Sequence, residues 1–207
     1  LGLVQKDHPG ISIEVLDAQL EDLDYVGVSS RVVSLSPDLI VTQLGSYTMK
    51  HDRPYAEFGY PTICISPESF DPLEIIRLYD VKSAYFTISE IEKTVSEGIE
   101  EFMQKGRIEH TAGYVIREGE ETRSTGTRPF VPLTDLPMPA YDLFCPEHYF
   151  KLQEKETGSR CAFISTARGC PFSCRFCTSW AEKPVRFKDI DQAIDEIAFF
   201  HDKHGCT

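Results

Sequence analysis

Several features of common protein classes are missing from this 207-residue chain. No apolar run approaches the roughly 18 residues that a membrane-spanning helix requires. There is no phosphate-binding glycine loop, no dinucleotide-binding glycine fingerprint and no serine–histidine–acid arrangement. Basic residues are fewer than acidic ones: the chain has 21 lysines and arginines and 33 aspartates and glutamates, which gives a net charge of −12. This balance argues against a nucleic-acid or membrane partner.

The cysteines do not suggest a disulfide framework. Seven cysteines in 207 residues are too few for such a framework, and an odd number cannot all pair. We also expect no export signal at the start of the chain. Free thiols of this kind favour a reducing, cytoplasmic location. Four cysteines have no partner at ligand spacing: Cys64, Cys145, Cys161 and Cys206. Cys64 is expected to be a small core residue within an apolar strand.

The other three cysteines are the most informative residues. Cys170, Cys174 and Cys177 have the spacing CxxxCxxC, which is typical of an iron–sulfur ligand set with one ligand missing. Three thiolates on a four-iron cluster leave one iron with an open position, where a substrate or cofactor can bind. The alternatives are a structural zinc site or inert cysteines. Structural zinc sites usually combine two CxxC-type cysteine motifs, and this chain has no second one.

The residues around this triplet predict its setting. Ala162–Thr166 is a short apolar and β-branched run, typical of a buried strand. Gly169 and Pro171 then break regular structure. We therefore expect Cys170 on a loop at the carboxyl end of that strand, where α/β folds bind ligands. Three aromatic side chains are expected to shield a cluster from water: Phe172, Phe176 and Trp180.

The motif resembles that of the radical S-adenosylmethionine (SAM) family, including the aromatic residue directly before the last cysteine. The resemblance implies a 4Fe–4S cluster held by Cys170, Cys174 and Cys177, with SAM chelated at the open iron. It also implies that one electron from the cluster cleaves SAM to a 5′-deoxyadenosyl radical, which abstracts hydrogen from a substrate. Phe176 would lie beside the adenine. The motif covers only residues 161 to about 179.

Strand and helix signals alternate in the first part of the chain. This order predicts an α/β fold, a doubly wound domain with a parallel sheet between helices. The expected strands are Ile11–Asp17, Leu39–Leu44, Pro61–Ile65 and Val81–Phe86. The expected helices are Leu20–Leu35, Pro72–Leu78 and one that begins at the capping box Ser89–Glu92 and ends at Lys105-Gly106.

The sequence changes character after residue 109. Ala112–Arg117 and Glu121–Thr125 predict a β-hairpin, and the proline-rich Arg128–Glu147 predicts an extended linker. Phe187–Gly205 predicts a helix with an apolar face. We therefore divide the chain into three segments: an α/β domain at 1–109, a hairpin and linker at 110–160, and the start of a radical SAM β/α barrel at 161–207. We also expect the chain to be a fragment, truncated at both ends.

This order of segments resembles the cobalamin-dependent class of radical SAM enzymes, as does the segment Leu133–Leu143 before the cysteine loop. The resemblance implies cobalamin bound between the first domain and the barrel. The chain departs from the class where Ser66-Pro67-Glu68 and Thr87–Glu90 replace the usual glycines after two strands. Glycines there would let the backbone approach a bulky ligand. The Asp-x-His-x-x-Gly signature is also absent, and His8 is expected to be a loop residue, so cobalamin binding stays open.

We predict SAM-dependent radical chemistry on a small molecule, either cobalamin-assisted methyl transfer or a rearrangement. The expected partner is a reducing electron donor such as flavodoxin or ferredoxin. Five cations between Arg168 and Lys188 form either a solvated face or a docking patch for such an acidic donor. Gly45, Ser46 and Thr48 follow a strand end, where they form either a plain turn or a cofactor contact. The alternative functions are a radical SAM methylthiotransferase acting on transfer RNA and a non-catalytic iron–sulfur electron carrier.

Overall fold

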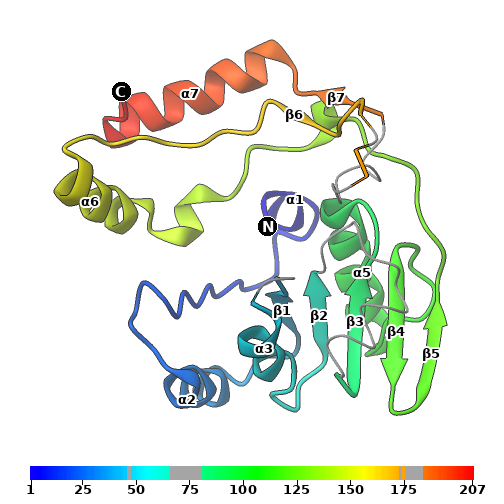
Figure 1. The fold of residues 1–207 in the computed structure, drawn as a ribbon. Coiled ribbons are helices and arrows are strands. Elements are labelled where there is room, and N and C mark those ends of the chain that lie inside the picture. Colours follow the sequence, from blue (N-terminus) through cyan, green and yellow to red (C-terminus); the bar gives the residue numbers. More distant parts are fainter. Residues whose placement is uncertain (46–47, 66–80, 173, 176–183) are drawn as a thin grey trace.

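A computed structural model of the protein describes residues 1–45, 48–65, 81–172, 174–175 and 184–207. This part of the chain centres on a five-stranded sheet with the order β1-β2-β3-β4-β5 (Figure 1). The strands are β1 (Ile40–Gln43), β2 (Thr62–Ile65), β3 (Ser83–Thr87), β4 (Tyr114–Glu118) and β5 (Glu121–Ser124). The first three are parallel, and β4 and β5 are each antiparallel to the strand before them. The expected α/β fold class is confirmed, as are three of the predicted strands.

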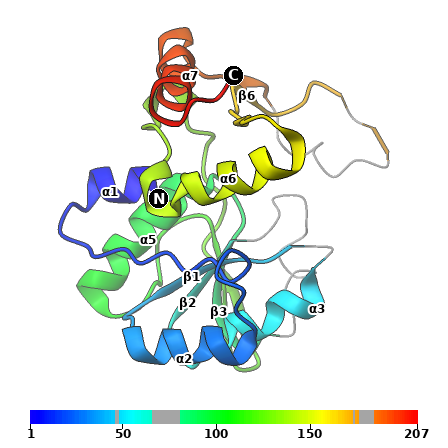
Figure 2. The same ribbon diagram turned by 90° about the vertical axis from the view of Figure 1, so that its left-hand side faces the viewer.

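Both faces of this sheet are covered. The elements around it are α1 (Gly2–Asp7), α2 (Tyr25–Leu35), α3 (Met49–Asp52), the 3-10 helix η1 (Arg53–Ala56) and α5 (Ile91–Lys105). Alternate residues of a strand point to opposite faces, so that Ile63 of β2 packs with Val95 of α5, whereas Cys64 packs with Ala56 of η1. Figure 2 shows α1 and α5 together on one side of the sheet and α3 on the other.

Helix α5 ends where expected but begins differently. Gly106 closes it in the left-handed conformation, with φ at 73°, and donates its N–H to the Phe102 carbonyl at 2.7 Å. The predicted capping box is wrong. The N-cap is Glu90, with φ at 37°, and no side chain caps the helix there. The Ser89 hydroxyl instead accepts the backbone N–H of Arg128 at 3.3 Å, so the residue expected to cap the helix holds the linker.

The segment before α2 contradicts one prediction. Residues 11–17, all of which the structure describes, form no strand. Ile11 and Ile13 nevertheless pack against the core under α5. Their alternating pattern therefore reports which side of the segment faces the core, but the backbone has no partner strand.

Helix α2 is shorter than predicted. It begins at Tyr25 because the side chain of Asp24 accepts the N–H of Gly27 at 2.8 Å and caps the helix. The residues from 18 to 22 form turns instead. The predicted helix Pro72–Leu78 lies outside the described residues.

Strands β4 and β5 confirm the predicted hairpin. Gly119, with φ at 60°, lies in the two-residue connection between them. The hairpin continues the main sheet, because β4 pairs along its length with β3 and sets Phe86 opposite Val115. The domain boundaries themselves stay a prediction.

The rest of the chain forms a second unit. Its elements are the 3-10 helices η2 (Leu133–Asp135) and η3 (Tyr141–Phe144), the helices α6 (Pro146–Thr157) and α7 (Ile190–His204), and the short strands β6 (Ala167–Arg168) and β7 (Arg186–Phe187). Its core joins Phe150 of α6 to Phe200 of α7 and to Cys206. Figure 1 shows this unit beyond the ends toward which β1, β2 and β3 point. Among the described helices, none combines the length and apolarity that crossing a membrane would need.

Two expectations for this unit need correction. The predicted strand Ala162–Thr166 is wrong, because regular pairing begins only at β6, which follows it. Ile164 packs against the α6–α7 core, but Phe163 beside it is 90% exposed, so the apolar run is buried on one side at most. Helix α6 was not predicted and lies within the segment assigned to the linker.

Candidate functional site

The cysteine motif lies between β6 and β7, and the predicted loop position of Cys170 is confirmed. Cys170 is a partly buried free thiol and Cys174 an exposed one. Gly169, with φ at 94°, turns the chain out of β6 directly before Cys170. Cys177, the third predicted ligand, lies outside the described residues. Two of the three predicted ligands are therefore placed on one loop.

The donors present suit an iron–sulfur cluster. Thiolates are its usual ligands, and two free thiols on an irregular loop can wrap a compact cluster. Within the described residues, no group of three or more potential metal ligands is gathered at one point, so the full ligand set stays a prediction. The predicted apolar wall is not formed by Phe172, which is 68% exposed. Phe176 and Trp180 lie outside the described residues.

The two strands that close the cysteine loop carry a pair of facing cations. Strand β6 pairs with β7 so that Arg168 lies directly opposite Arg186, and we call this pair the closing rung. Like charges in that arrangement destabilise a ladder. Each arginine is balanced by a glutamate at the start of α5, Arg168 by Glu92 and Arg186 by Glu90. The loop is therefore tied to the first unit at both of its ends.

Glu90 is the more deeply buried of these glutamates, with 3% of its surface exposed. Its carboxylate lies 2.9 Å from both Nη atoms of Arg186 and accepts the backbone N–H of Val131 at 2.7 Å. Arg186 also donates to the Val131 carbonyl at 2.6 Å, and its guanidinium lies over the Phe130 ring, 4.6 Å from its centre. A buried ion pair needs such additional hydrogen bonds to offset its desolvation. This contact joins α5, the linker and β7.

Glu92 and Arg168 form a half-buried bidentate pair. Nη1 of Arg168 donates to Oε2 of Glu92 at 3.0 Å, and Nη2 donates to Oε1. Burial alone would raise the pKa of Glu92, but the hydrogen bonds and charge of Arg168 outweigh it and hold the pKa below its ordinary value. Glu92 is therefore ionised at neutral pH and retains Arg168, two positions before Cys170.

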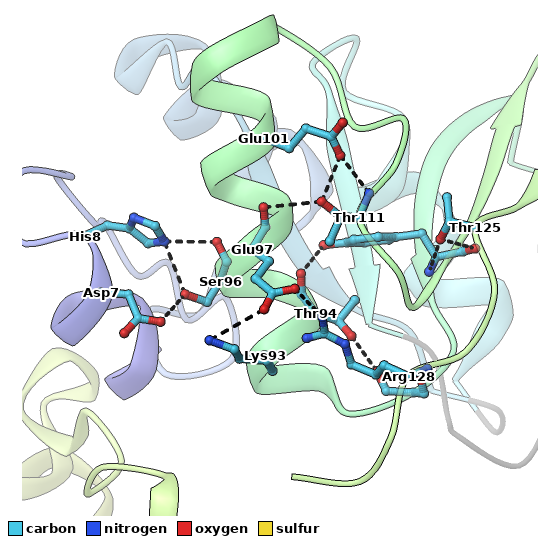
Figure 3. Close-up of polar contacts among 12 residues, drawn as sticks. Asp7, His8, Lys93, Thr94, Ser96, Glu97, Glu101, Thr111, Thr125 and Arg128 are labelled. Atoms are coloured by element: carbon cyan, nitrogen blue, oxygen red, sulfur yellow. Dashed lines mark hydrogen bonds and ion pairs between the residues drawn. The ribbon is translucent and has the colours of Figure 1, made fainter.

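Helix α5 also holds the linker and α1, as Figure 3 shows. Glu97 contacts the guanidinium of Arg128, whose side chain is almost buried. Ser96 donates its hydroxyl to Asp7 at 2.7 Å, and its carbonyl oxygen lies 3.0 Å from Nε2 of His8. The prediction that His8 is a loop residue is confirmed, and its contacts fasten the end of α1 to α5.

The remaining cysteines are separate from the loop motif. Cys64 lies in the sheet core, as predicted, and burial raises the pKa of its thiol to about 12. Cys206 is buried in the α6–α7 core, and burial raises its pKa as well. Cys145 and Cys161 are exposed. Among the residues that the structure describes, these thiols gather in no group of three ligands.

The carboxyl edge of β1, β2 and β3 is the second candidate binding surface, because ligands of parallel sheets bind there. After β1, Oδ2 of Asp52 accepts the N–H of Gly45 at 2.7 Å and the hydroxyl of Thr48. A β-carbon at Gly45 would lie 2.3 Å from the Thr48 hydroxyl, so the turn is tightly closed. Ser46 and residues 66–68 lie outside the described residues. The described contacts at this corner favour a plain turn.

The predicted stretch of cations is partly used inside the molecule. Besides the two arginines of the closing rung, Lys188 contacts the buried carboxylate of Glu196. Tyr141 donates to the same carboxylate, and burial together with this neighbour raises the pKa of the phenol. Arg175 is exposed, and Lys183 lies outside the described residues. Three of the five cations are therefore balanced by internal carboxylates, which leaves less positive charge for a docking patch.

No family model matches the chain, but three curated proteins are similar in sequence. An uncharacterized methyltransferase of Pyrococcus horikoshii is 23% identical over 98% of this chain and 44% of its own length. The anaerobic magnesium-protoporphyrin IX monomethyl ester cyclase of Cereibacter sphaeroides is 31% identical over 45% of this chain and 15% of its own. The cytidylyl-2-hydroxyethylphosphonate methyltransferase of Streptomyces wedmorensis is 31% identical over 35% of this chain and 15% of its own length. The chain spans less than half the length of each relative.

Solved structures share its fold. OxsB, a cobalamin-dependent SAM radical enzyme, superposes in its aqua-cobalamin-bound form with a TM-score of 0.73 and 17% identity, over 100% of this chain and 30% of OxsB. The form with both aqua-cobalamin and SAM bound gives a TM-score of 0.70 over 95% of this chain and 28% of OxsB. At this identity the likeness shows the fold. The expected fold, that of a cobalamin-dependent SAM radical enzyme, is therefore confirmed.

Proposed function

We propose that the chain is part of a radical SAM enzyme that acts on a small molecule by cobalamin-assisted methyl transfer or a rearrangement. In this proposal Cys170, Cys174 and Cys177 hold a 4Fe–4S cluster, and Phe176 lines the adenine site. The observation that carries it is the loop of free thiols tied to the carboxyl edge of an α/β sheet. The names of the relatives agree with it, because they include two methyltransferases, a cyclase and a cobalamin-dependent radical enzyme.

The residues of this chain have binding and positioning roles in that reaction. When bound, the cluster supplies the electron that cleaves SAM, and cobalamin supplies a carrier for a methyl group. Gly169 gives the turn that presents Cys170, and the closing rung fixes both ends of the cysteine loop. The high pKa of Cys64 keeps it protonated in the core, where it does not compete as a thiolate.

We also infer the setting of the reaction. The free thiols favour a reducing cytoplasm, where flavodoxin or ferredoxin would supply the electron. The net charge of −12 disfavours a transfer RNA substrate. A methylthiotransferase would also need three further cluster cysteines. Cys64 is buried in the sheet, and Cys145 and Cys161 are exposed in the second unit, so the described thiols favour the small-molecule reaction.

Anaerobic reconstitution tests the cluster assignment. We expect about four iron and four sulfide ions per chain, as in a cubane cluster. Alanine at Cys170, Cys174 or Cys177 should remove most of that iron. Cys145→Ala is the matched control, because this exposed free thiol lies outside the motif. Zinc in place of iron and sulfide, or equal iron loss in the control, would contradict the proposal.

Two additions separate the proposed enzyme from an electron carrier. Adding SAM should change the electron paramagnetic resonance (EPR) spectrum of the reduced cluster, because SAM would bind at the open iron. A carrier with four thiolate ligands would show no change. Hydroxocobalamin added before desalting should remain bound and give a coloured protein, whereas a colourless protein would contradict the cobalamin assignment.

A further inference from the structure

The contacts of the closing rung indicate a further role for the start of helix α5, because both arginines of the rung pair with glutamates there. We propose that Glu90 and Glu92 are positioning residues, which set the place of the cysteine loop relative to the carboxyl edge of the first sheet through Arg186 and Arg168. This inference rests on the proposed function, because its purpose is the placement of a cluster on that loop. Each glutamate acts through an arginine: Glu92 contacts Arg168, and Glu90 contacts Arg186.

The first step of the argument is the geometry of the loop. Arg168 and Arg186 are opposite each other in the β6–β7 ladder, so the chain between them is a closed loop that begins and ends at this rung. Only Gly169 separates Arg168 from Cys170. A shift of the rung would therefore be passed directly to the first predicted ligand.

The second step is the rigidity of the element that holds the rung. Helix α5 follows β3 at the carboxyl edge, and Val95 and Ile99 anchor it on the sheet core. Its first turn is further tied by Thr94, whose hydroxyl donates to the Ser89 carbonyl at 2.7 Å. The glutamates are thus fixed relative to the sheet, and they transfer that position to the loop.

The backbone of Glu90 gives independent support. Its φ of 37° is in the left-handed region, which costs a residue with a side chain on the order of 1 kcal/mol or more. A helix start does not require this conformation, and a serine cap at the preceding position was available in the sequence. The conformation coincides with the three polar contacts of the Glu90 carboxylate to Arg186 and Val131. Strain held by such contacts is typical of positions with a specific task.

The two ion pairs differ in what they contribute to folding. The Glu90–Arg186 pair is buried, and removing one partner would leave a buried charge. The Glu92–Arg168 pair is more open, with 25% of the glutamate side chain and 37% of the arginine side chain exposed. A partly exposed pair of this kind contributes at most about 1 kcal/mol to stability, less than a buried pair whose partner is removed. Disrupting Glu92–Arg168 should therefore displace the loop without unfolding the protein, which makes this pair the right one to test.

The test uses the reconstituted full chain and compares four variants with the wild type. Glu92→Gln and Arg168→Gln each break the pair, and the double variant Glu92→Arg/Arg168→Glu restores it with reversed charges. Glu100→Gln is the matched control, because Glu100 is an exposed glutamate on the same helix, and its described side-chain partner is Gln104 of that helix. Urea unfolding of each variant shows that it is folded.

We expect the single variants to unfold at a urea concentration close to that of the control but to lose iron to a chelator about tenfold faster, a size typical of residues that support metal ligands. Their reduced clusters should also give broadened EPR spectra, because the loop is no longer held in one position. The charge-reversed double variant should recover the wild-type spectrum and iron retention. A merely structural pair would change the unfolding midpoint and leave the spectrum intact.

The outcomes separate this inference from the proposed function. If the wild type holds iron and sulfide but the single variants match Glu100→Gln in spectrum and iron retention, the positioning role is wrong and the proposed function stands. Failure of the double variant to recover would also overturn the inference, because the two residues would then act separately. If the wild type holds no iron–sulfur cluster, the proposed function fails and the positioning role fails with it.

Discussion

The two units of the molecule bury their apolar residues to different degrees. In the first, strands β2, β3 and β4 are packed on both faces, and Phe86 is wholly buried. In the second, helix α7 buries Glu196, Phe200 and His204. Its isoleucines face outward, and with the phenylalanine before the helix they form what we call the α7 stripe: Phe187, Ile190, Ile194 and Ile197.

This difference shows that the two units are stabilised in different ways. The first unit has an apolar core on each face of its sheet. The second has a small aromatic core and leaves an apolar face of α7 exposed. Where the units meet at the closing rung, the described contacts are ion pairs and hydrogen bonds of α5. Burial therefore decides the stability of the first unit, whereas charge decides how the cysteine loop is placed against it.

The largest predicted effect contrasts a phenylalanine from each unit. Phe86→Ala should lower the free energy of unfolding by about 3–5 kcal/mol, because it removes a fully buried ring from the sheet core. Phe163→Ala, the matched change in the second unit, should alter it by less than about 0.5 kcal/mol, because that ring is in solvent. Urea unfolding followed by circular dichroism measures both. Equal losses would show that Phe163 is covered in solution and that the contrast between the units is wrong.

The same contrast explains which parts of the fold the sequence could predict. Strands β1, β2 and β3, the hairpin and the end of α5 follow from local signals, namely apolar runs between turn residues and a glycine in the left-handed conformation at Gly106. The segments 11–17 and 162–166 have equally strand-like patterns, yet neither forms a strand in the structure. A strand needs a partner as well as a pattern, and the partner is not encoded locally.

The candidate site divides in the same way. The CxxxCxxC spacing is local, so the loop and its predicted ligands were accessible from the sequence. The glutamates that hold the loop were not, because Glu90 and Arg186 are 96 positions apart. Glu92 instead matched a capping box, and Arg168 matched a solvated cationic face. The signal available was charge complementarity: an acidic helix start and an arginine on each side of the cysteine loop.

A smaller effect, which depends on pH, is expected inside the first unit. Burial alone would raise the pKa of Glu101, but hydrogen bonds from Lys105, Thr111 and the His110 backbone hold it well below the ordinary value. Glu101→Gln should therefore cost about 1–3 kcal/mol at pH 7. Since the folded-state pKa is lowered, the stabilisation is complete above the unfolded-state pKa of about 4.3 and declines as the pH falls below it.

Urea unfolding of the wild type and Glu101→Gln at pH 7 and pH 3 measures this difference. The gap in unfolding free energy between the two proteins should be smaller at pH 3. Glu100→Gln, one position earlier and exposed, should show little gap at either pH. A gap that widens on acidification would mean that Glu101 is protonated in the folded protein, contrary to its four hydrogen-bond donors.

The smallest predicted change in stability tests the contrast between the units most directly, because the same isoleucine-to-glutamine substitution is made once in each unit. Ile194→Gln lies in the α7 stripe and should change the unfolding free energy by less than about 0.5 kcal/mol while reducing the binding of a hydrophobic dye. Ile116→Gln puts the same amide into the buried strand β4 and should cost several kcal/mol, on the order of 2–5. If Ile194→Gln is as costly as Ile116→Gln, the α7 stripe is covered in solution, and the second unit is stabilised by burial as the first is.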